Sequence, residues 1–323
     1  MGRLLRQILP ALFSAIVLAA CGGGGSDNGG SVAVQPVANL GASEPNAPQL
    51  TGDTATDGLN WFNFRRQQLG LAPLVRNAKL DLAALGHSNY QKVNNVITHE
   101  QTLGKPAFTG VTVKDRLKAA GYALPADNYA YGEVISSTSS DSGFNAAEDL
   151  IAAIYHRFLV LEPMFKEAGV GAATAAGGPT YFTANFAVIG LTGGLARSAV
   201  VSYPFSGQQR VPLNFFSDNE APDPVPGKNE VGYPISIHAN ILATVMTDSF
   251  TVRPRGGAAL PVQLLTGVAN PNTPNVAVDP HTSPSAAAII PLNPLSSATT
   301  YDVQFTGSVD GVPVSHSWSF TTQ

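Results

Sequence analysis

Three polar residues in the middle of the chain have side chains that can hold a proton, an ion or a ligand. His99 lies in the loop sequence "VITHEQ", Glu133 in "YGEVIS", and His156 interrupts the apolar run "LIAAIYHRFLVLEPMF". Two imidazoles and one carboxylate are a workable zinc ligand set with an open coordination position, and the same groups can act as general acid or base. A buried helix seldom carries such a histidine without a partner or a function.

The spacing of the remaining polar residues excludes several familiar chemistries. "HEQTL" has no second histidine four residues after His99, so it is not a zincin helix. No G-x-S-x-G elbow is present, and the single cysteine, Cys21, lies near the N-terminus. "GVGAATAAGG" lacks the spacing of a dinucleotide-binding loop. Since no nucleophile motif remains, the sequence leaves open whether the protein is an enzyme.

The stretch around His156 predicts one long helix, "FNAAEDLIAAIYHRFLVLEP", which begins at a capping box formed by Asn145 and Glu148. On a continuous helix, His156 falls opposite the apolar stripe, on the same side as Asp149. Small alanines beside the histidine leave space there. We therefore expect His156 to face a cleft, with Asp149 as a further group on that side.

Other polar residues of these segments are expected to be structural. Arg157 should pair with Glu162 or cap backbone carbonyls. His87 lies on the packing stripe of its helix and reads as a satisfied core histidine. His316 alternates onto the same face of its strand as Trp318, which places it toward the interior.

The first zone that must position these residues, 58–192, mixes helix and strand patterns. Helical patterns cover "GLNWFNFRRQQLG", "NAKLDLAALGHSNYQKVN" and "TVKDRLKAAGY", the last beginning at a capping Thr112. "YAYGEVISS" and "PTYFTANFAVIG" alternate like strands. Because the elements do not alternate as βαβ units, the fold class is α+β.

The second zone, 198–323, consists of short strand patterns bounded by turn residues, which is typical of a β-sandwich. Asp310-Gly311 predicts a tight hairpin between the last two strands. "LTGGLARS", Leu191–Ser198, is the predicted hinge between the zones.

The N-terminus has the pattern of an export signal. Arg3 and Arg6 precede an apolar run that is too short to span a bilayer, and the run ends in "LAAC" at Cys21. This resembles a bacterial lipoprotein lipobox, which implies cleavage before Cys21 and lipid attachment to it. Gly22 in place of aspartate implies sorting to the outer membrane. The net charge of −4 gives no reason to expect a nucleic acid as partner.

Six motifs in order resemble the bacterial SCP-like (CAP) domain. They are "NFRRQQLGLAPL", "LDLAALGHSNY", "THEQ", "DRLKAAGY", "YGEVIS" and "HRFLVLEPMFKEAGVG". The resemblance implies an α-β-α sandwich with an open cleft, where two histidines and two glutamates can hold a divalent metal. Carried over by motif, these are His99, Glu133 and His156. The sequence departs from the family in two places. Val134 stands where the family has an asparagine after the glutamate. The family's second glutamate is missing, and Asp149, on the same predicted helix face as His156, is its substitute.

The predicted organisation is a lipoprotein signal peptide (1–20), a flexible tether (21–57), a CAP/SCP-like domain (58–192) and an Ig-like β-sandwich (198–323). We expect an exported protein of the cell envelope, anchored to the outer membrane or cell surface through Cys21. Its cleft would bind an envelope ligand, together with a divalent ion such as zinc. The alternative is a metal-assisted hydrolase of envelope peptide or polysaccharide, and a third possibility is a structural protein with an unused cleft.

Overall fold

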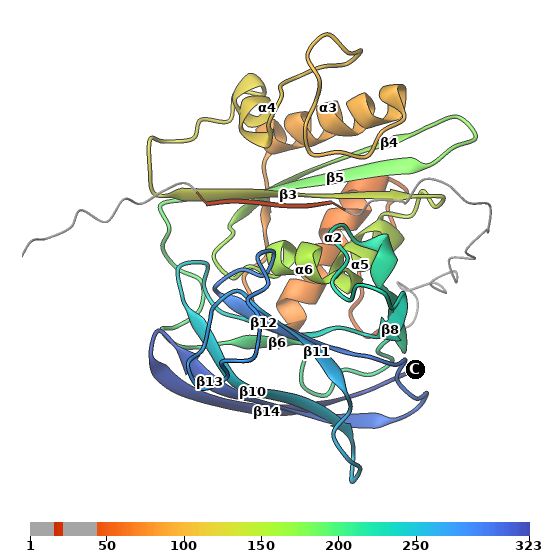
Figure 1. Ribbon diagram of the computed structural model, residues 1–323. Helices are drawn as coiled ribbons and strands as arrows, with labels where there is room; N and C mark the ends of the chain where they lie inside the picture. Colours follow the sequence, from red (N-terminus) through yellow and green to blue (C-terminus); the bar gives the residue numbers. More distant parts are fainter. Residues whose placement is uncertain (1–15, 22–43) are drawn as a thin grey trace, which may run out of the picture.

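The computed structural model describes residues 16–21 and 44–323, which form two stacked parts (Figure 1). One part is a five-stranded sheet with helices on both faces, and the other consists of antiparallel β-sheets. This arrangement confirms the predicted α+β class, with a CAP-type layered region followed by an all-β region. Most of the predicted signal peptide and tether lies outside the described residues.

The sheet of the first part has the order β1-β3-β5-β4-β2. Its three central strands are antiparallel, whereas each edge strand runs parallel to its neighbour. The strands are β1 (Ile16–Cys21), β2 (Val75–Arg76), β3 (Tyr129–Thr138), β4 (Glu167–Thr174) and β5 (Thr180–Ile189).

The helices of the first part cover the sheet on both sides (Figure 1). Helices α3 and α4 lie on the outer face, while α2, α5 and α6 lie on the face toward the second part. Their bounds are α2 (Thr54–Gln68), α3 (Ala78–Asn94), α4 (Val113–Ala119), α5 (Gly143–Ala152) and α6 (Ile154–Val160). Alternation along β3 turns Tyr129, Tyr131 and Glu133 toward α3 and α4, and Ala130 and Val134 toward the opposite layer.

Helix α3 packs unusually close to strand β4 because two strand residues are glycines. A Cβ atom at Gly169 would collide with the backbone of Leu80, and one at Gly171 would collide with the backbone of Leu85. The glycine-rich "GVGAAT" is therefore a strand against which a helix can pack at short range.

The helix predicted around His156 is in fact two helices. Helix α5 begins after Ser142, whose side chain accepts a hydrogen bond from the Asn145 amide, so the predicted Asn145–Glu148 capping box is wrong. Ala153 has an extended conformation (φ −69°, ψ 119°) and separates α5 from α6. Because the helical phase is interrupted there, His156 and Asp149 do not share one side of a continuous helix, contrary to the prediction.

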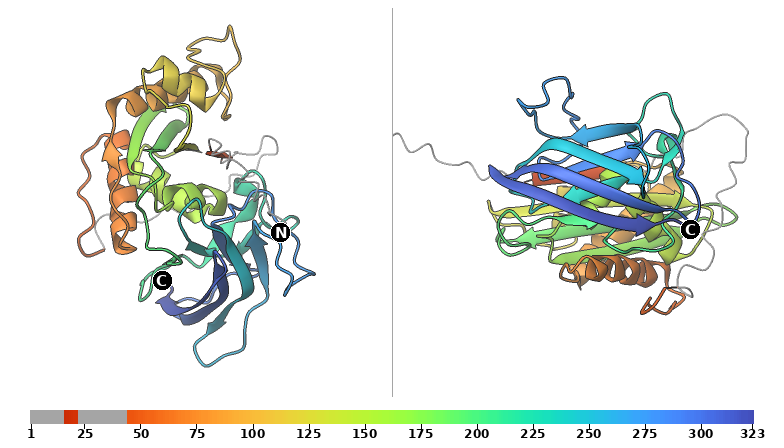
Figure 2. Two further views of the ribbon diagram at one scale, coloured as in Figure 1. Left: turned by 90° about the vertical axis from the view of Figure 1, so that its left-hand side faces the viewer. Right: turned by 90° about the horizontal axis from the view of Figure 1, so that it is seen from below.

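The second part contains two larger sheets, of order β10-β13-β14 and β11-β12-β9-β6, and a β7-β8 pair (Figure 2). Asp310 (φ 52°) and Gly311 (φ 75°) form the turn between β13 and β14, which confirms the predicted hairpin. The strands are β6 (Val201–Tyr203), β7 (Asn214–Phe216), β8 (Glu230–Gly232), β9 (Ile235–His238), β10 (Val245–Pro254), β11 (Val262–Thr266), β12 (Ala286–Pro291), β13 (Thr300–Val309) and β14 (Val312–Thr321).

A single apolar core runs through both parts. It extends from Trp61 and Phe62 on α2, through Phe158 on α6, to Ile289 and Phe305 in the second part. A smaller cluster lies between α3, α4 and the sheet. The predicted domain limits and the Ig-like assignment stay predictions. In the described residues, no helix is both long and apolar enough to span a membrane.

Candidate functional site

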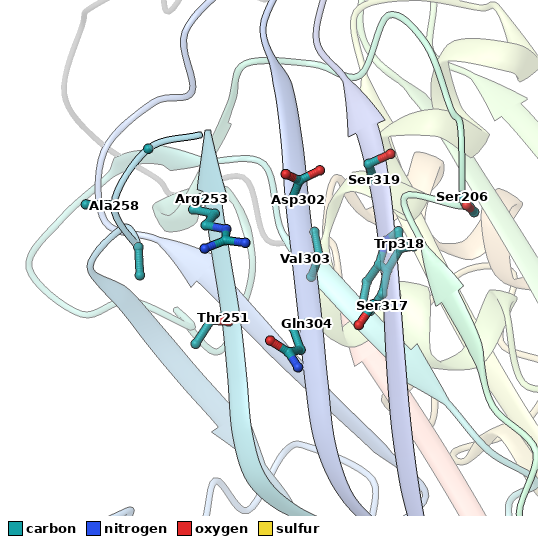
Figure 3. A pocket seen from close by; sticks show the side chains of 12 residues that line it. Ser206, Thr251, Arg253, Ala258, Asp302, Val303, Gln304, Ser317, Trp318 and Ser319 are labelled. Atoms are coloured by element: carbon teal, nitrogen blue, oxygen red, sulfur yellow. The ribbon is translucent and has the colours of Figure 1, made fainter. Parts of the chain in front are cut away.

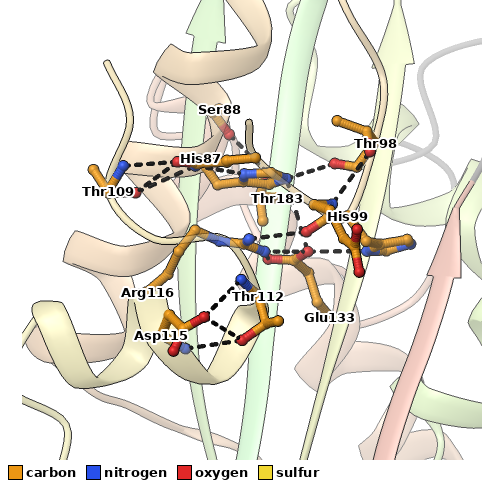
Figure 4. Close-up of polar contacts among 12 residues, drawn as sticks. His87, Ser88, Thr98, His99, Thr109, Thr112, Asp115, Arg116, Glu133 and Thr183 are labelled. Carbon is orange, nitrogen blue, oxygen red and sulfur yellow. Dashed lines mark hydrogen bonds and ion pairs between the residues drawn. The ribbon is translucent and has the colours of Figure 1, made fainter. Parts of the chain in front are cut away.

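His99 and Glu133 lie together on the α3–α4 face of the sheet (Figure 4). His99 belongs to the loop between these helices, and its Nδ1 atom is 2.9 Å from Oε1 of Glu133. The carboxylate of Glu133 has no solvent exposure, whereas the His99 side chain is 17% exposed. The cluster therefore presents a partly accessible imidazole that is held by a buried carboxylate.

Arg116 on α4 completes this cluster. Its Nη2 atom is 2.7 Å from each carboxylate oxygen of Glu133, and its side chain is fully buried. Its Nη1 atom donates to the carbonyl oxygens of His99 (2.8 Å) and Val111 (3.3 Å). The confirmed cap at Thr112 fixes where α4 begins and hence where Arg116 lies. Arg116 thus ties the loop, the helix and the strand to one carboxylate.

His87 on α3 is buried behind the cluster. Its Nε2 atom is 2.7 Å from the Thr98 carbonyl oxygen, and its Nδ1 atom is 2.9 Å from Nε2 of Gln101. These contacts confirm the prediction of a satisfied core histidine. His87 also approaches Glu133 Oε1 at 3.8 Å, which places a second imidazole beside the carboxylate.

Charge compensation decides the ionisation of the cluster. Burial alone would raise the pKa of Glu133, but Arg116 and the neighbouring histidines outweigh it and lower the pKa to about 2. Burial lowers the pKa of His87 to about 4, although the charge of Glu133 opposes this. Near neutral pH the cluster therefore contains an ionised Glu133, a neutral His87 and a guanidinium.

His156 lies in a different environment, at the start of α6. Its side chain is fully buried, and its Nδ1 atom is 3.0 Å from Oε1 of Glu220 in the second part. The same carboxylate accepts hydrogen bonds from the amides of Ile154 (2.8 Å) and Tyr155 (2.6 Å). Since Ala153 offers no side-chain cap, Glu220 caps α6 from the second part of the chain.

Arg157, which follows His156, also contacts the second part of the chain. Its guanidinium donates to the carbonyl oxygens of Ile151 (2.6 Å) and Pro234 (2.7 Å) and packs over the rings of Tyr203 and Tyr233. Of the two predicted roles, carbonyl capping is confirmed. The "HR" pair interrupts the apolar run because both residues face the second part.

The structure thus brings together His99 and Glu133 and does not join His156 or Asp149 to them. His156 belongs to the layer on the opposite face of the sheet and pairs with Glu220. Burial and the charge of Glu148 raise the pKa of Asp149 to about 7. Asp149 lies on α5, in the layer on the opposite face of the sheet from the His99–Glu133 cluster.

The donor set does not fit the predicted divalent ion. In the part of the chain that the structure describes, no three His, Cys, Asp or Glu side chains are grouped so as to hold a metal. Both oxygens of Glu133 already accept hydrogen bonds from Arg116, and the ring of His156 faces Glu220. A cation bound to Glu133 would have to displace a guanidinium.

Sequence reasoning missed Arg116 and Glu220. Arg116 had a usable signal, because "DRLKAAGY" begins a capped helix directly after the His99 loop and a buried carboxylate needs a cation. Glu220 had none, because it lies 64 positions from His156 and meets α6 only in the folded chain.

A shallow hollow of about 560 Å³ lies on the outer face of the β10-β13-β14 sheet (Figure 3). Its charged side chains, Arg253 and Asp302, are not buried. It has the character of a solvated sheet face, so the cluster around Glu133 is the stronger candidate site.

Residues 59–186 match the sequence model of the cysteine-rich secretory protein family, CAP. The chain is similar to a solved extracellular protein with an SCP domain from Bacillus anthracis (25% identity, TM-score 0.35), covering 45% of this chain and 44% of that one. It is also similar to an outer surface protein from Borrelia burgdorferi (16% identity, TM-score 0.34), covering 40% of this chain and 87% of that one. A third similar structure is a cysteine-rich secretory protein from Staphylococcus aureus (15% identity, TM-score 0.31), covering 44% of this chain and 41% of that one. The chain thus spans under half of the Bacillus and Staphylococcus proteins. No curated protein gives a significant match.

Proposed function

We propose that this chain, with its CAP domain at residues 59–186, is an exported, lipid-anchored protein of the cell envelope that binds a ligand at His99. The export pattern ending in "LAAC" and the single Cys21 support the anchoring. The anchor would hold the protein at the outer membrane or cell surface, within reach of an envelope ligand.

The observation that carries the binding proposal is the Glu133 cluster. A buried carboxylate that is ionised at neutral pH accepts a hydrogen bond from Nδ1 of His99 and so fixes the orientation of the ring. The His99 side chain is partly exposed, while Glu133 and Arg116 are fully buried. A ligand at this surface would meet an imidazole whose orientation the buried ion pair already sets.

Ligand binding ranks ahead of the metal-assisted hydrolase for a geometric reason. The hydrolase requires His99 and His156 to hold one ion, but His156 pairs with Glu220 in another layer of the molecule. Binding requires only the groups that the structure assembles around Glu133.

Co-sedimentation with purified peptidoglycan sacculi tests this proposal. We expect the full-length protein to bind sacculi and His99→Ala to weaken binding on the order of tenfold, or about 1.4 kcal/mol. His281→Ala, which changes an exposed histidine in the second part, is the matched control and should bind normally. Equal binding by both variants would contradict a ligand site at His99, and release of soluble fragments would favour hydrolysis.

Membrane partitioning tests the anchor separately. The protein should enter the detergent phase and incorporate labelled palmitate, and Cys21→Ser should abolish both. Palmitate incorporation by the Cys21→Ser protein would show that the lipobox interpretation is wrong.

A further inference from the structure

We infer that Arg116 is the resident cation of this site: its guanidinium fills the place beside Glu133 that a divalent ion would need, so that the carboxylate is held in an ion pair in place of a metal. This inference deepens the proposed function, because it concerns the same ligand site. It makes Arg116 a positioning residue that also excludes metals.

The geometry around Glu133 supports this role. One guanidinium nitrogen of Arg116 lies 2.7 Å from both carboxylate oxygens, and neither side chain is exposed to solvent. Arginine does not lose its proton in proteins, so this positive charge is permanent. A divalent ion approaching the same oxygens would meet a like charge at short range in a poorly screened environment.

Arg116 is also fixed in place. Its second terminal nitrogen donates to the carbonyl oxygens of His99 and Val111, at the two ends of the loop that carries the histidine. Moving the guanidinium away from Glu133 would break these bonds and loosen the loop. A metal therefore cannot displace Arg116 without disturbing the residue that would be its own ligand.

Removing the guanidinium would leave two potential ligands without a competing cation. They are Glu133 and His99, whose Nδ1 atom lies 2.9 Å from Oε1 of the carboxylate. His87 Nε2 lies 3.8 Å from the same oxygen, but it already pairs with the Thr98 carbonyl oxygen. The group that keeps a zinc ion from Glu133 and His99 is thus Arg116.

Metal titration of the full-length protein tests the inference. Zinc binding is followed by calorimetry, and Co²⁺ by its visible absorption, which reports nitrogen and oxygen coordination. The wild type should show neither signal. Arg116→Met, which keeps an unbranched apolar side chain but removes the guanidinium and its charge, should gain a zinc site with an affinity on the order of tenfold or more above the wild type. Arg116→Met/His99→Ala should lose it again.

Two controls separate this effect from a change in net charge. Arg116→Lys returns a cation to the cluster and should abolish the gain. Arg76→Met removes an exposed arginine that pairs with Asp81, and should bind no zinc.

Two results would overturn the inference. One is zinc binding by the wild type that disappears in His99→Ala, and the other is a folded Arg116→Met protein without a zinc site. If Arg116→Met does not fold, the wild type and Arg116→Lys still test the inference, because zinc binding through His99 in either protein would overturn the inference.

The outcomes also separate this inference from the proposed function. If sacculus binding fails but the zinc pattern holds, the function is wrong and the role of Arg116 stands. If the wild type binds zinc through His99 and still binds sacculi, the role of Arg116 is wrong and the function stands.

Discussion

Two close histidine–glutamate pairs in the described residues have nearly the same distance but differ in burial and in how the carboxylate is compensated. His99 Nδ1 lies 2.9 Å from Glu133, and His156 Nδ1 lies 3.0 Å from Glu220. In the first pair, Arg116 neutralises the carboxylate, and the histidine is partly exposed. In the second pair, backbone amides of α6 compensate the carboxylate, and the histidine is fully buried.

This difference is consistent with the proposed binding role of the first pair, whereas the second pair joins the two parts of the chain. A carboxylate removed from water must be compensated by charge or by hydrogen bonds. Arg116 compensates Glu133 within the CAP region, and the paired histidine stays partly exposed. The hydrogen bonds that compensate Glu220 instead join the two parts of the chain. Their donors lie on α6, and the accepting carboxylate lies in the second part.

Of the substitutions that test this comparison, Glu220→Ala should lower the stability of the protein most. The substitution leaves the first amides of α6 and the His156 ring without their acceptor in a buried place, so we expect a loss of about 4 kcal/mol in unfolding free energy. Chemical denaturation of the full-length protein measures it. Asp218→Ala, an exposed acid of the same segment, should change stability by less than about 0.5 kcal/mol. Similar losses for both would mean that Glu220 does not cap α6.

The pH dependence of stability should show that Glu133 is ionised in the folded protein. The folded-state pKa of Glu133 is lowered from 4.5 to about 2, so its contribution is fully present above pH 4.5 and is lost as the pH falls toward 2. A shift of this size corresponds to about 3 kcal/mol. Denaturation curves at several pH values should show this decline in the wild type and a smaller one in Glu133→Gln. Parallel curves for both proteins would contradict the assigned ionisation.

His156→Ala should destabilise the protein by about 1–2 kcal/mol, because a fully buried ring and its bond to Glu220 are lost. A histidine lining an open cleft would have given almost no change. Thermal melts of the variant distinguish these two environments.

His99→Ala should have the smallest effect on stability, less than about 1 kcal/mol, since the ring is partly exposed and Arg116 still compensates Glu133. The same variant should bind sacculi more weakly, as proposed above. A large loss of stability would mean that His99 is a structural residue like His156.

Much of the fold could be predicted because the decisive signals are local. Alternation predicted β3 and β5, Thr112 predicted the start of α4, and Asp310-Gly311 predicted the last hairpin. The pairing of His99 with Glu133 was likewise predictable from motif order. These features depend on neighbours in sequence or on a motif with a fixed place in the sheet.

The position of His156 could not be predicted, because its cause is not local. Ala153 is itself a strong helix former, and a run without glycine or proline favours one continuous helix. The break is stabilised by Glu220, which supplies an acceptor to the new helix start. A single sequence contains no periodicity that connects these two positions.

The shared core has a consequence for how this chain can be divided. All seven residues of α6 are buried, and the helix is enclosed between the sheet of one part and the strands of the other. Separating the parts would expose this helix and remove its cap, so neither half is an exchangeable module. Calorimetry of the full-length protein should therefore record one cooperative transition, and transplanting the CAP region into another protein would require a substitute for the surface that the second part provides.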